Sequence, residues 1–181
     1  MSSQTYLPEN AAQWTGLIIA VAACFAAAGI GSLYTTPAIP VWYASLQKPA
    51  WTPPPWVFGP AWTLLYLMMA VAVWLVWRER GFAGGGAAIT LFAVQLILNA
   101  LWSIIFFGWR RPGLALIEIF FLWAAIFATM LSFWRISQPA AWLMWPYLLW
   151  VTFAGFLNLS IWKLNRYMEA TPRTGSASRV K

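Results

Sequence analysis

Five stretches of about twenty residues run along the chain with almost no charged side chain, and short polar or charged segments separate them. An α-helix rises about 1.5 Å per residue, so each stretch is long enough to cross the roughly 30 Å hydrocarbon core of a bilayer. A backbone in lipid must satisfy its own hydrogen bonds, which favours helices over open strands. The predicted spans are residues 15–34, 56–77, 87–107, 113–134 and 142–162.

These spans predict an all-α integral membrane protein, a bundle of five transmembrane helices over residues 14–166. Glycine and proline at 84–86, 112–113 and 139 mark the breaks between the last four spans. Residues 1–13 form a polar N-terminal segment, and 167–181 read as a disordered basic tail. The links are too short for a separate soluble domain, and the link 35–55 is the longest.

Charge distribution predicts the orientation in the membrane. The chain is 62% hydrophobic and 8% charged, with a net charge of +7. With five spans, Arg78, Arg80 and Arg135 fall on the side of the N-terminus. Because cytoplasmic loops carry the excess of Lys and Arg, we expect the N-terminus outside and the C-terminus in the cytoplasm. The opposite, richer set is Lys48, Arg110, Arg111, Lys163, Arg166, Arg173, Arg179 and Lys181.

Aromatic and polar side chains recur at helical spacing inside three spans, so each span presents one face inward. Such faces are typical of an apolar ligand site with a few orienting polar groups. For Gln95 and Asn99, helix-joining hydrogen bonds explain the pattern as well as ligand contact does. For the deeper Trp62, Trp102 and Trp150, core packing is an open alternative. The faces are Trp62, Tyr66, Met69 and Val73; Gln95, Asn99, Trp102 and Phe106; and Tyr147, Trp150, Ala154 and Asn158.

Several features have simpler interpretations. Tryptophans at span ends are typical interfacial anchors. Glu118, the only acidic residue within a span, is better read as a snorkelling ion pair with Arg110 and Arg111 than as a proton-handling group. Small residues in the first span, among them Ala22, Ala26 and Gly29, favour a close helix–helix contact within one protomer or between two.

The composition excludes most familiar catalytic chemistry. The chain has no histidine, no paired carboxylates and no phosphate-binding glycine loop after a strand. We therefore predict no metal site and no resident cofactor. By contrast, the segment 48–66 holds three Trp, one Tyr and five Pro, and the stiff Pro-Pro-Pro run at 53–55 suits one wall of a pocket for a flat apolar ligand.

The sequence resembles the tryptophan-rich sensory protein family, also called translocator proteins or peripheral-type benzodiazepine receptors. Long motifs in the family's order carry the resemblance over about residues 14–166. They are Trp42-Tyr43, Gln47-Lys48-Pro49-Ala50-Trp51-Thr52-Pro53-Pro54, Trp56-Val57-Phe58-Gly59-Pro60, Trp62-Thr63-Leu64-Leu65-Tyr66, Gln95-Leu96, Leu98-Asn99, Trp102, Phe106-Phe107-Gly108, Pro146-Tyr147-Leu148-Leu149-Trp150, Phe153-Ala154 and Leu157-Asn158.

The resemblance implies a five-helix bundle, often a homodimer, in a bacterial inner membrane. It implies porphyrin or haem-like tetrapyrroles as ligands, with sterols or drug-like compounds in some members, in a pocket between the first loop and helices one, two, four and five. Leu159 replaces the tyrosine of the sterol motif in animal members, which makes sterol recognition less expected here. The implied ligand-binding residues are Trp42, Trp51, Trp62, Tyr66, Asn99, Tyr147, Trp150 and Ala154.

Three functions remain open from the sequence. The favoured one is a membrane receptor or sensor that binds tetrapyrroles and regulates tetrapyrrole or stress responses. The second is an enzyme that degrades bound porphyrin in light, with Trp62 and Trp150 as its catalytic residues, matching tryptophans of some bacterial members. The third is a translocator of tetrapyrroles or lipids, ranked last because no second gate and no coupling acid besides Glu118 is evident.

Overall fold

The structure is a computed structural model that describes residues 9–170, with side chains from residue 13 to 166. The described chain is predominantly helical and has no strand, as the sequence predicts for an all-α membrane protein. Its elements are α1 (Glu9–Ala38), η1 (Ile39–Tyr43), η2 (Pro55–Val57), α2 (Phe58–Ser103), η3 (Ile104–Gly108), α3 (Pro112–Trp134) and α4 (Gln138–Ala170).

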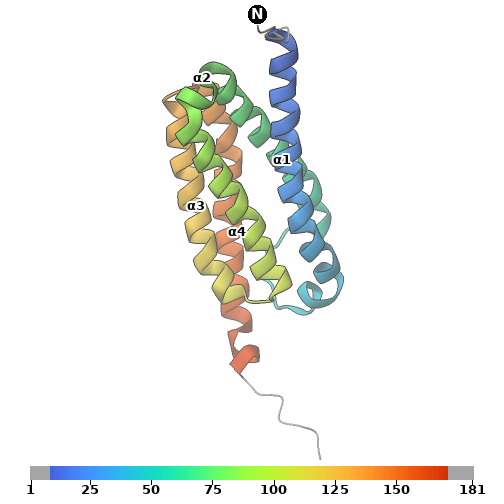
Figure 1. Ribbon diagram of the computed structural model, residues 1–181. Coiled ribbons are helices and arrows are strands. Elements are labelled where there is room, and N and C mark those ends of the chain that lie inside the picture. The colour runs from blue at the N-terminus through green and yellow to red at the C-terminus, as the bar shows by residue number, and fades with distance from the viewer. Residues whose placement is uncertain (1–8, 171–181) are drawn as a thin grey trace, which may run out of the picture.

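The structure does not support the predicted count of five separate helices. Four helical stretches among the described residues are long and apolar enough to cross a membrane, and the predicted spans 56–77 and 87–107 belong to one element, α2. The glycines at 84–86, expected to end a helix, stay helical. The chain instead reverses at Gly81, whose φ of 60° and ψ of −166° are not helical. Figure 1 shows the resulting turn between two antiparallel arms of α2.

The reversal needs only Gly81, so the chain is helical directly before and directly after this residue. Non-glycine residues essentially do not adopt this combination of φ and ψ, because their Cβ collides with the backbone. Gly81 therefore separates a first arm (residues 58–80) from a second arm (residues 82–103).

Other boundaries differ modestly from the prediction. α1 begins at Glu9, inside the segment expected to precede the domain, and α4 continues to Ala170, past the predicted limit at 166. Residues 1–8 and 171–181, with most of the predicted tail, lie outside the described residues.

The helices bury a common apolar core and leave an apolar outer surface. α1 packs mainly on α2, and α3 packs mainly on α4. α2 also contacts both α3 and α4. Met69, Val76 and Met144 are fully buried, whereas Leu33 is 73% exposed and Phe120 is 68% exposed. Large apolar side chains on the outside of long helices suit contact with lipid tails, and the protein is an integral membrane protein.

Two π-helical turns shape the end of the bundle that carries the longest loop. η1 follows α1 at a point where Pro37 and Pro40 remove backbone donors, and η3 ends the second arm of α2. Wider turns of this kind often occur at functional sites. Here both bring aromatic side chains to one region, the Tyr43 ring lying 5.8 Å from that of Phe107.

We expect Gly81→Ala to destabilise the protein by about 1–3 kcal/mol, because alanine is strained at this φ and ψ. The measurement is the thermal unfolding midpoint in detergent. Gly86→Ala is the matched control, since Gly86 is helical and a Cβ there meets no atom within 4 Å. Alanine in a helix interior is favourable, so the control should match or exceed the wild type. Equal midpoints for both variants would contradict the assigned reversal.

Candidate functional site

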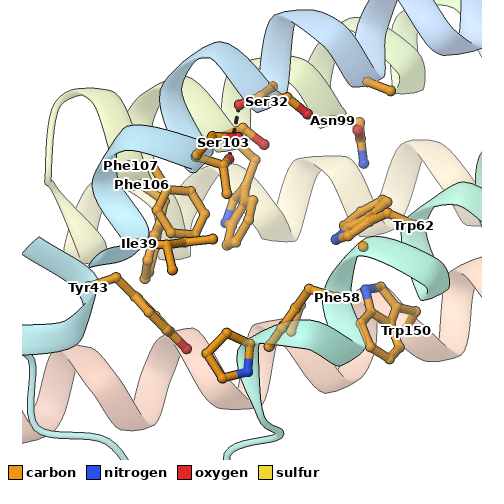
Figure 2. Close-up of a pocket in the computed structure, with 18 of the residues that line it drawn as sticks. Ser32, Ile39, Tyr43, Phe58, Trp62, Asn99, Ser103, Phe106, Phe107 and Trp150 are labelled. Carbon is orange, nitrogen blue, oxygen red and sulfur yellow. Dashed lines mark hydrogen bonds between the residues drawn. The ribbon is translucent and has the colours of Figure 1, made fainter. Parts of the chain in front are cut away.

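A cavity of about 460 Å³ opens within the bundle, between α1, the two arms of α2 and α4. This volume lies within the range of small-molecule sites. Its walls are mostly aromatic and aliphatic, as Figure 2 shows for Phe58, Trp62, Phe106 and Trp150. The lining residues are Phe25, Ala28, Gly31, Ser32, Thr35, Thr36, Ile39, Tyr43, Pro55, Trp56, Phe58, Gly59, Trp62, Thr63, Tyr66, Asn99, Trp102, Ser103, Phe106, Phe107, Trp150, Ala154, Leu157, Asn158 and Ile161.

Most of the residues that the sequence assigned to ligand binding meet at this cavity. Trp62 and Tyr66 come from the first arm of α2, Asn99 from the second arm, and Trp150 and Ala154 from α4. Helical spacing places these side chains on inward faces, so elements far apart in the chain converge on one space.

The other three predicted residues lie behind or beside the lining. Tyr147 is fully buried, with its ring 6.2 Å from that of Trp62. Trp42 packs edge-on against Phe106 at 5.5 Å, so it contacts a lining side chain without lining the cavity itself. Trp51 is 50% exposed and packs edge-on against Phe153 at 5.7 Å.

A buried polar chain forms one part of the cavity wall. The Tyr66 hydroxyl donates to Asn99 Oδ1, and Asn99 Nδ2 donates to the Tyr147 hydroxyl over 3.0 Å. Asn99 is 3% exposed, and these two hydrogen bonds satisfy both the oxygen and the nitrogen of its amide inside the protein. This chain joins both arms of α2 to α4, and two of its members, Tyr66 and Asn99, line the cavity.

Gln95 does not reach the cavity, so of its two interpretations the structure favours joining helices. Its Nε2 lies 4.0 Å from Met69 Sδ on the other arm of α2, and its Oε1 has no hydrogen-bond partner. Glu118 is 7% exposed, and neither carboxyl oxygen has a hydrogen-bond partner in the described part of the chain. The expected snorkelling ion pair with Arg110 and Arg111 is therefore not formed.

The cavity also corrects the helices that the resemblance implied. Counted along the predicted spans, the fourth one corresponds to α3, and α3 contributes no lining residue. The third span, now the second arm of α2, contributes Asn99, Trp102 and Ser103. The sequence's own inward faces on spans two, three and five agree with this arrangement.

Sequence reasoning missed the α1 side of the cavity. Ser32, Thr35 and Thr36 line it, and their signal was a run of hydroxyl side chains near the end of an otherwise apolar span. Tyr43 and Phe58 were also missed as lining residues, although both lie within or beside motifs that the sequence singled out. No group of three or more His, Cys, Asp or Glu among the described residues could hold a metal ion.

The loop of residues 46–54, here called the strap, connects η1 to η2 and is fastened to α4. Asn165 Oδ1 accepts a hydrogen bond from the Gln47 amide over 3.0 Å, and Asn165 Nδ2 donates to the Gln47 carbonyl over 2.9 Å. The Lys48 ammonium donates to the carbonyls of Tyr43 and Leu46 at 2.7 and 2.8 Å. These bonds hold the ends of η1 and η2, which carry Tyr43, Pro55 and Trp56, at the cavity.

A family model provides the decisive comparison, because the TspO/MBR family matches residues 20–163. The chain belongs to the TspO/MBR family. The match covers every residue that lines the cavity.

Curated relatives support the assignment over most of the chain. The chain is 42% identical to the tryptophan-rich protein TspO of Chlorobaculum tepidum, over 82% of this chain and 95% of that protein. It is 40% identical to the translocator protein of Bos taurus, over 80% of this chain and 86% of that protein. It is 39% identical to the tryptophan-rich sensory protein of Cereibacter sphaeroides, over 84% of this chain and 92% of that protein.

We expect Tyr147→Phe to destabilise the protein by about 1–3 kcal/mol, because the buried Asn99 amide loses its acceptor. Tyr66→Phe should act similarly by leaving Asn99 Oδ1 without a donor. Thermal unfolding in detergent measures both. Tyr34→Phe is the control, since Tyr34 is 40% exposed and lies outside this chain of hydrogen bonds. If all three variants unfolded like the wild type, the polar chain would carry no stability.

Asn165→Ala should free the strap, because both backbone groups of Gln47 lose their partner. Hydrogen exchange of a peptide covering residues 46–54 should then become faster, as expected for a backbone amide without a protected hydrogen bond. Ser160→Ala is the matched control: its hydroxyl donates only to Phe156 on the same helix. Unchanged exchange in Asn165→Ala would show that other contacts fasten the strap.

Proposed function

We propose that this protein is a membrane receptor or sensor that binds porphyrin or haem-like tetrapyrroles in the cavity and regulates tetrapyrrole or stress responses. The observation that carries the proposal is one cavity with the indoles of Trp62 and Trp150 in its walls and the Tyr66–Asn99 pair at its polar side. A flat aromatic macrocycle stacks on indoles, and a few fixed polar groups orient it. The tetrapyrrole is the ligand here, with no resident cofactor.

Family membership supports a role in sensing or translocation at the general level. The names of the relatives describe a sensory protein and a translocator protein. The identity of the ligand comes from the resemblance and from the shape and chemistry of the cavity, and drug-like compounds or sterols suit its apolar walls as well.

The membrane arrangement is part of the same proposal. The two arms of α2 each cross the bilayer once, because a straight helix of 46 residues would be about 69 Å long, more than twice the hydrocarbon thickness. The chain then crosses five times and its two ends lie on opposite sides. Arg110, Arg111 and Lys163 are exposed at the end that carries the strap, which we assign to the cytoplasm of a bacterial inner membrane. A homodimer stays a prediction.

A second candidate, light-dependent porphyrin degradation, is favoured by one observation. Trp62 and Trp150, the two implied catalytic tryptophans, both line the same cavity, where the Trp62 ring packs edge-on against Tyr147 and the Trp150 ring packs edge-on against Phe58. A bound porphyrin would therefore contact both indoles. The alternative of a tetrapyrrole or lipid translocator has no comparable observation in its favour.

A titration of protoporphyrin IX into the detergent-solubilised protein, in the dark, tests binding through the Soret band. We expect saturable binding by the wild type, weakened about tenfold or more in Trp62→Phe/Trp150→Phe because two stacking surfaces are reduced. Trp134→Phe/Trp142→Phe is the control, since both side chains are exposed and outside the cavity. Absence of saturable binding by the wild type would overturn the proposal.

Illumination of the same samples separates a sensor from an enzyme. An enzyme should consume porphyrin in light and oxygen, and a single Trp62→Phe or Trp150→Phe change that still binds should abolish the loss. A receptor should lose protoporphyrin IX no faster than the Trp62→Phe and Trp150→Phe variants that still bind it.

A further inference from the structure

Exposure of the cavity lining is sharply divided between elements. Every lining residue on the second arm of α2, on η3 and on α4 is buried or half-buried, including Leu157 and Ile161. The exposed lining residues all lie on α1, on η2 or at the start of α2. They are Phe25, Ser32, Thr36, Pro55, Trp56, Gly59 and Thr63.

The cavity therefore opens sideways, between α1 and the beginning of the first arm of α2. Phe25, Ser32 and Thr36 form one lip of this side opening, and Trp56, Gly59 and Thr63 form the other. The end toward the strap is closed by buried groups such as Tyr43, and the bonds of Asn165 and Lys48 fasten that end.

Two hydroxyl groups on or beside the lips bond to their own helix. The Thr63 hydroxyl donates to the Gly59 carbonyl at 2.9 Å, and the neighbouring Thr35 hydroxyl donates to the Gly31 carbonyl at 2.9 Å. A hydroxyl that bonds to its own helix needs no water and presents its methyl group outward. These side chains can therefore face hydrocarbon without an unsatisfied donor.

The position of the opening along the helices places it within the bilayer. Trp56 is 74% exposed and has the character of an interfacial anchor. Thr63 follows it by seven residues, which is about 10 Å at the rise of a helix. The opening thus begins near the headgroups and extends into the hydrocarbon layer, where a flat, lipid-soluble molecule resides.

We infer that the ligand enters and leaves the cavity sideways from the lipid, through the gap between α1 and the first arm of α2, while the strap stays fastened. The inference rests on the proposed function for its occupant, a tetrapyrrole dissolved in the bilayer. Gly59 is the smallest residue on the lips, and a Cβ built there meets no atom within 4 Å. A large side chain at this position can obstruct the gap without disturbing the packing.

Ligand exchange kinetics in nanodiscs test the route. Protoporphyrin IX association and dissociation are followed in the dark for wild type, Gly59→Trp and Gly29→Trp. An obstructed passage raises the barrier in both directions, so Gly59→Trp should slow both association and dissociation about tenfold. Gly29→Trp is the matched control: Gly29 is exposed on α1, has open space around its Cβ and lies outside the lining.

Two kinetic outcomes would overturn the inference. Unchanged rates in Gly59→Trp would place the route elsewhere. A weaker Kd with an unchanged association rate would make Gly59 a ligand contact instead of part of a passage.

A second measurement needs no tetrapyrrole and so separates the route from the proposed function. Bimane is attached to Thr63→Cys in bilayers, and to Ser45→Cys as a control at an exposed residue just before the strap. The native Cys24 is fully buried and should not react. Bimane at residue 63 should be quenched by doxyl-labelled phospholipid and little by aqueous iodide, and bimane at residue 45 should show the reverse. Quenching of residue 63 by iodide alone would show an aqueous opening and sink the inference even if protoporphyrin IX binds.

Discussion

The structure depends on one constraint: within an apolar solvent, each polar group must find its partner inside the protein. The backbone meets this demand by being helical, and three buried asparagine side chains meet it by bridging elements. Asn99, Asn158 and Asn165 each use both the oxygen and the nitrogen of the amide. Asn99 joins the two arms of α2 to α4, Asn158 receives a bond from Trp102 and donates to the Pro112 carbonyl, and Asn165 fastens the strap. Because unsatisfied amides are costly in this setting, these three residues fix which helices meet and at what height.

The cavity follows from those junctions. Asn99 and Asn158 hold α2 and α4 together on the buried side of the cavity, while α1 lines the opposite side, where the Thr35 hydroxyl bonds to its own helix. Aromatic rings fill the space between these fixed points, with Trp102 stacked on Phe106 at 5.1 Å and Phe58 edge-on to Trp150 at 5.9 Å. The result is a mostly apolar chamber with a few polar groups in its wall. That composition suits an amphipathic, planar ligand better than a small polar substrate.

Much of this arrangement could be predicted from spacing. The inward faces containing Trp62, Asn99 and Trp150 were evident because a helix repeats every 3.6 residues and polar groups avoid lipid. The same reasoning could not separate residues that touch the cavity from those just behind it, so Tyr147 and Trp42 were grouped with lining residues. A difference of a few ångströms in depth depends on how helices cross, and spacing along one helix does not contain that information.

The sequence by itself determined the fold class, the membrane location, the family and the aromatic character of the site, because these follow from long apolar runs and extended motifs. Only the tertiary structure decided where the chain reverses, since several glycines between residues 81 and 86 were equally suitable and only Gly81 adopts a φ and ψ closed to other residues. It also decided that α3 stays out of the cavity wall and that Glu118 lies buried without its expected arginine partners. These outcomes depend on which helices pack against one another, and that choice is made by contacts between residues far apart in the chain.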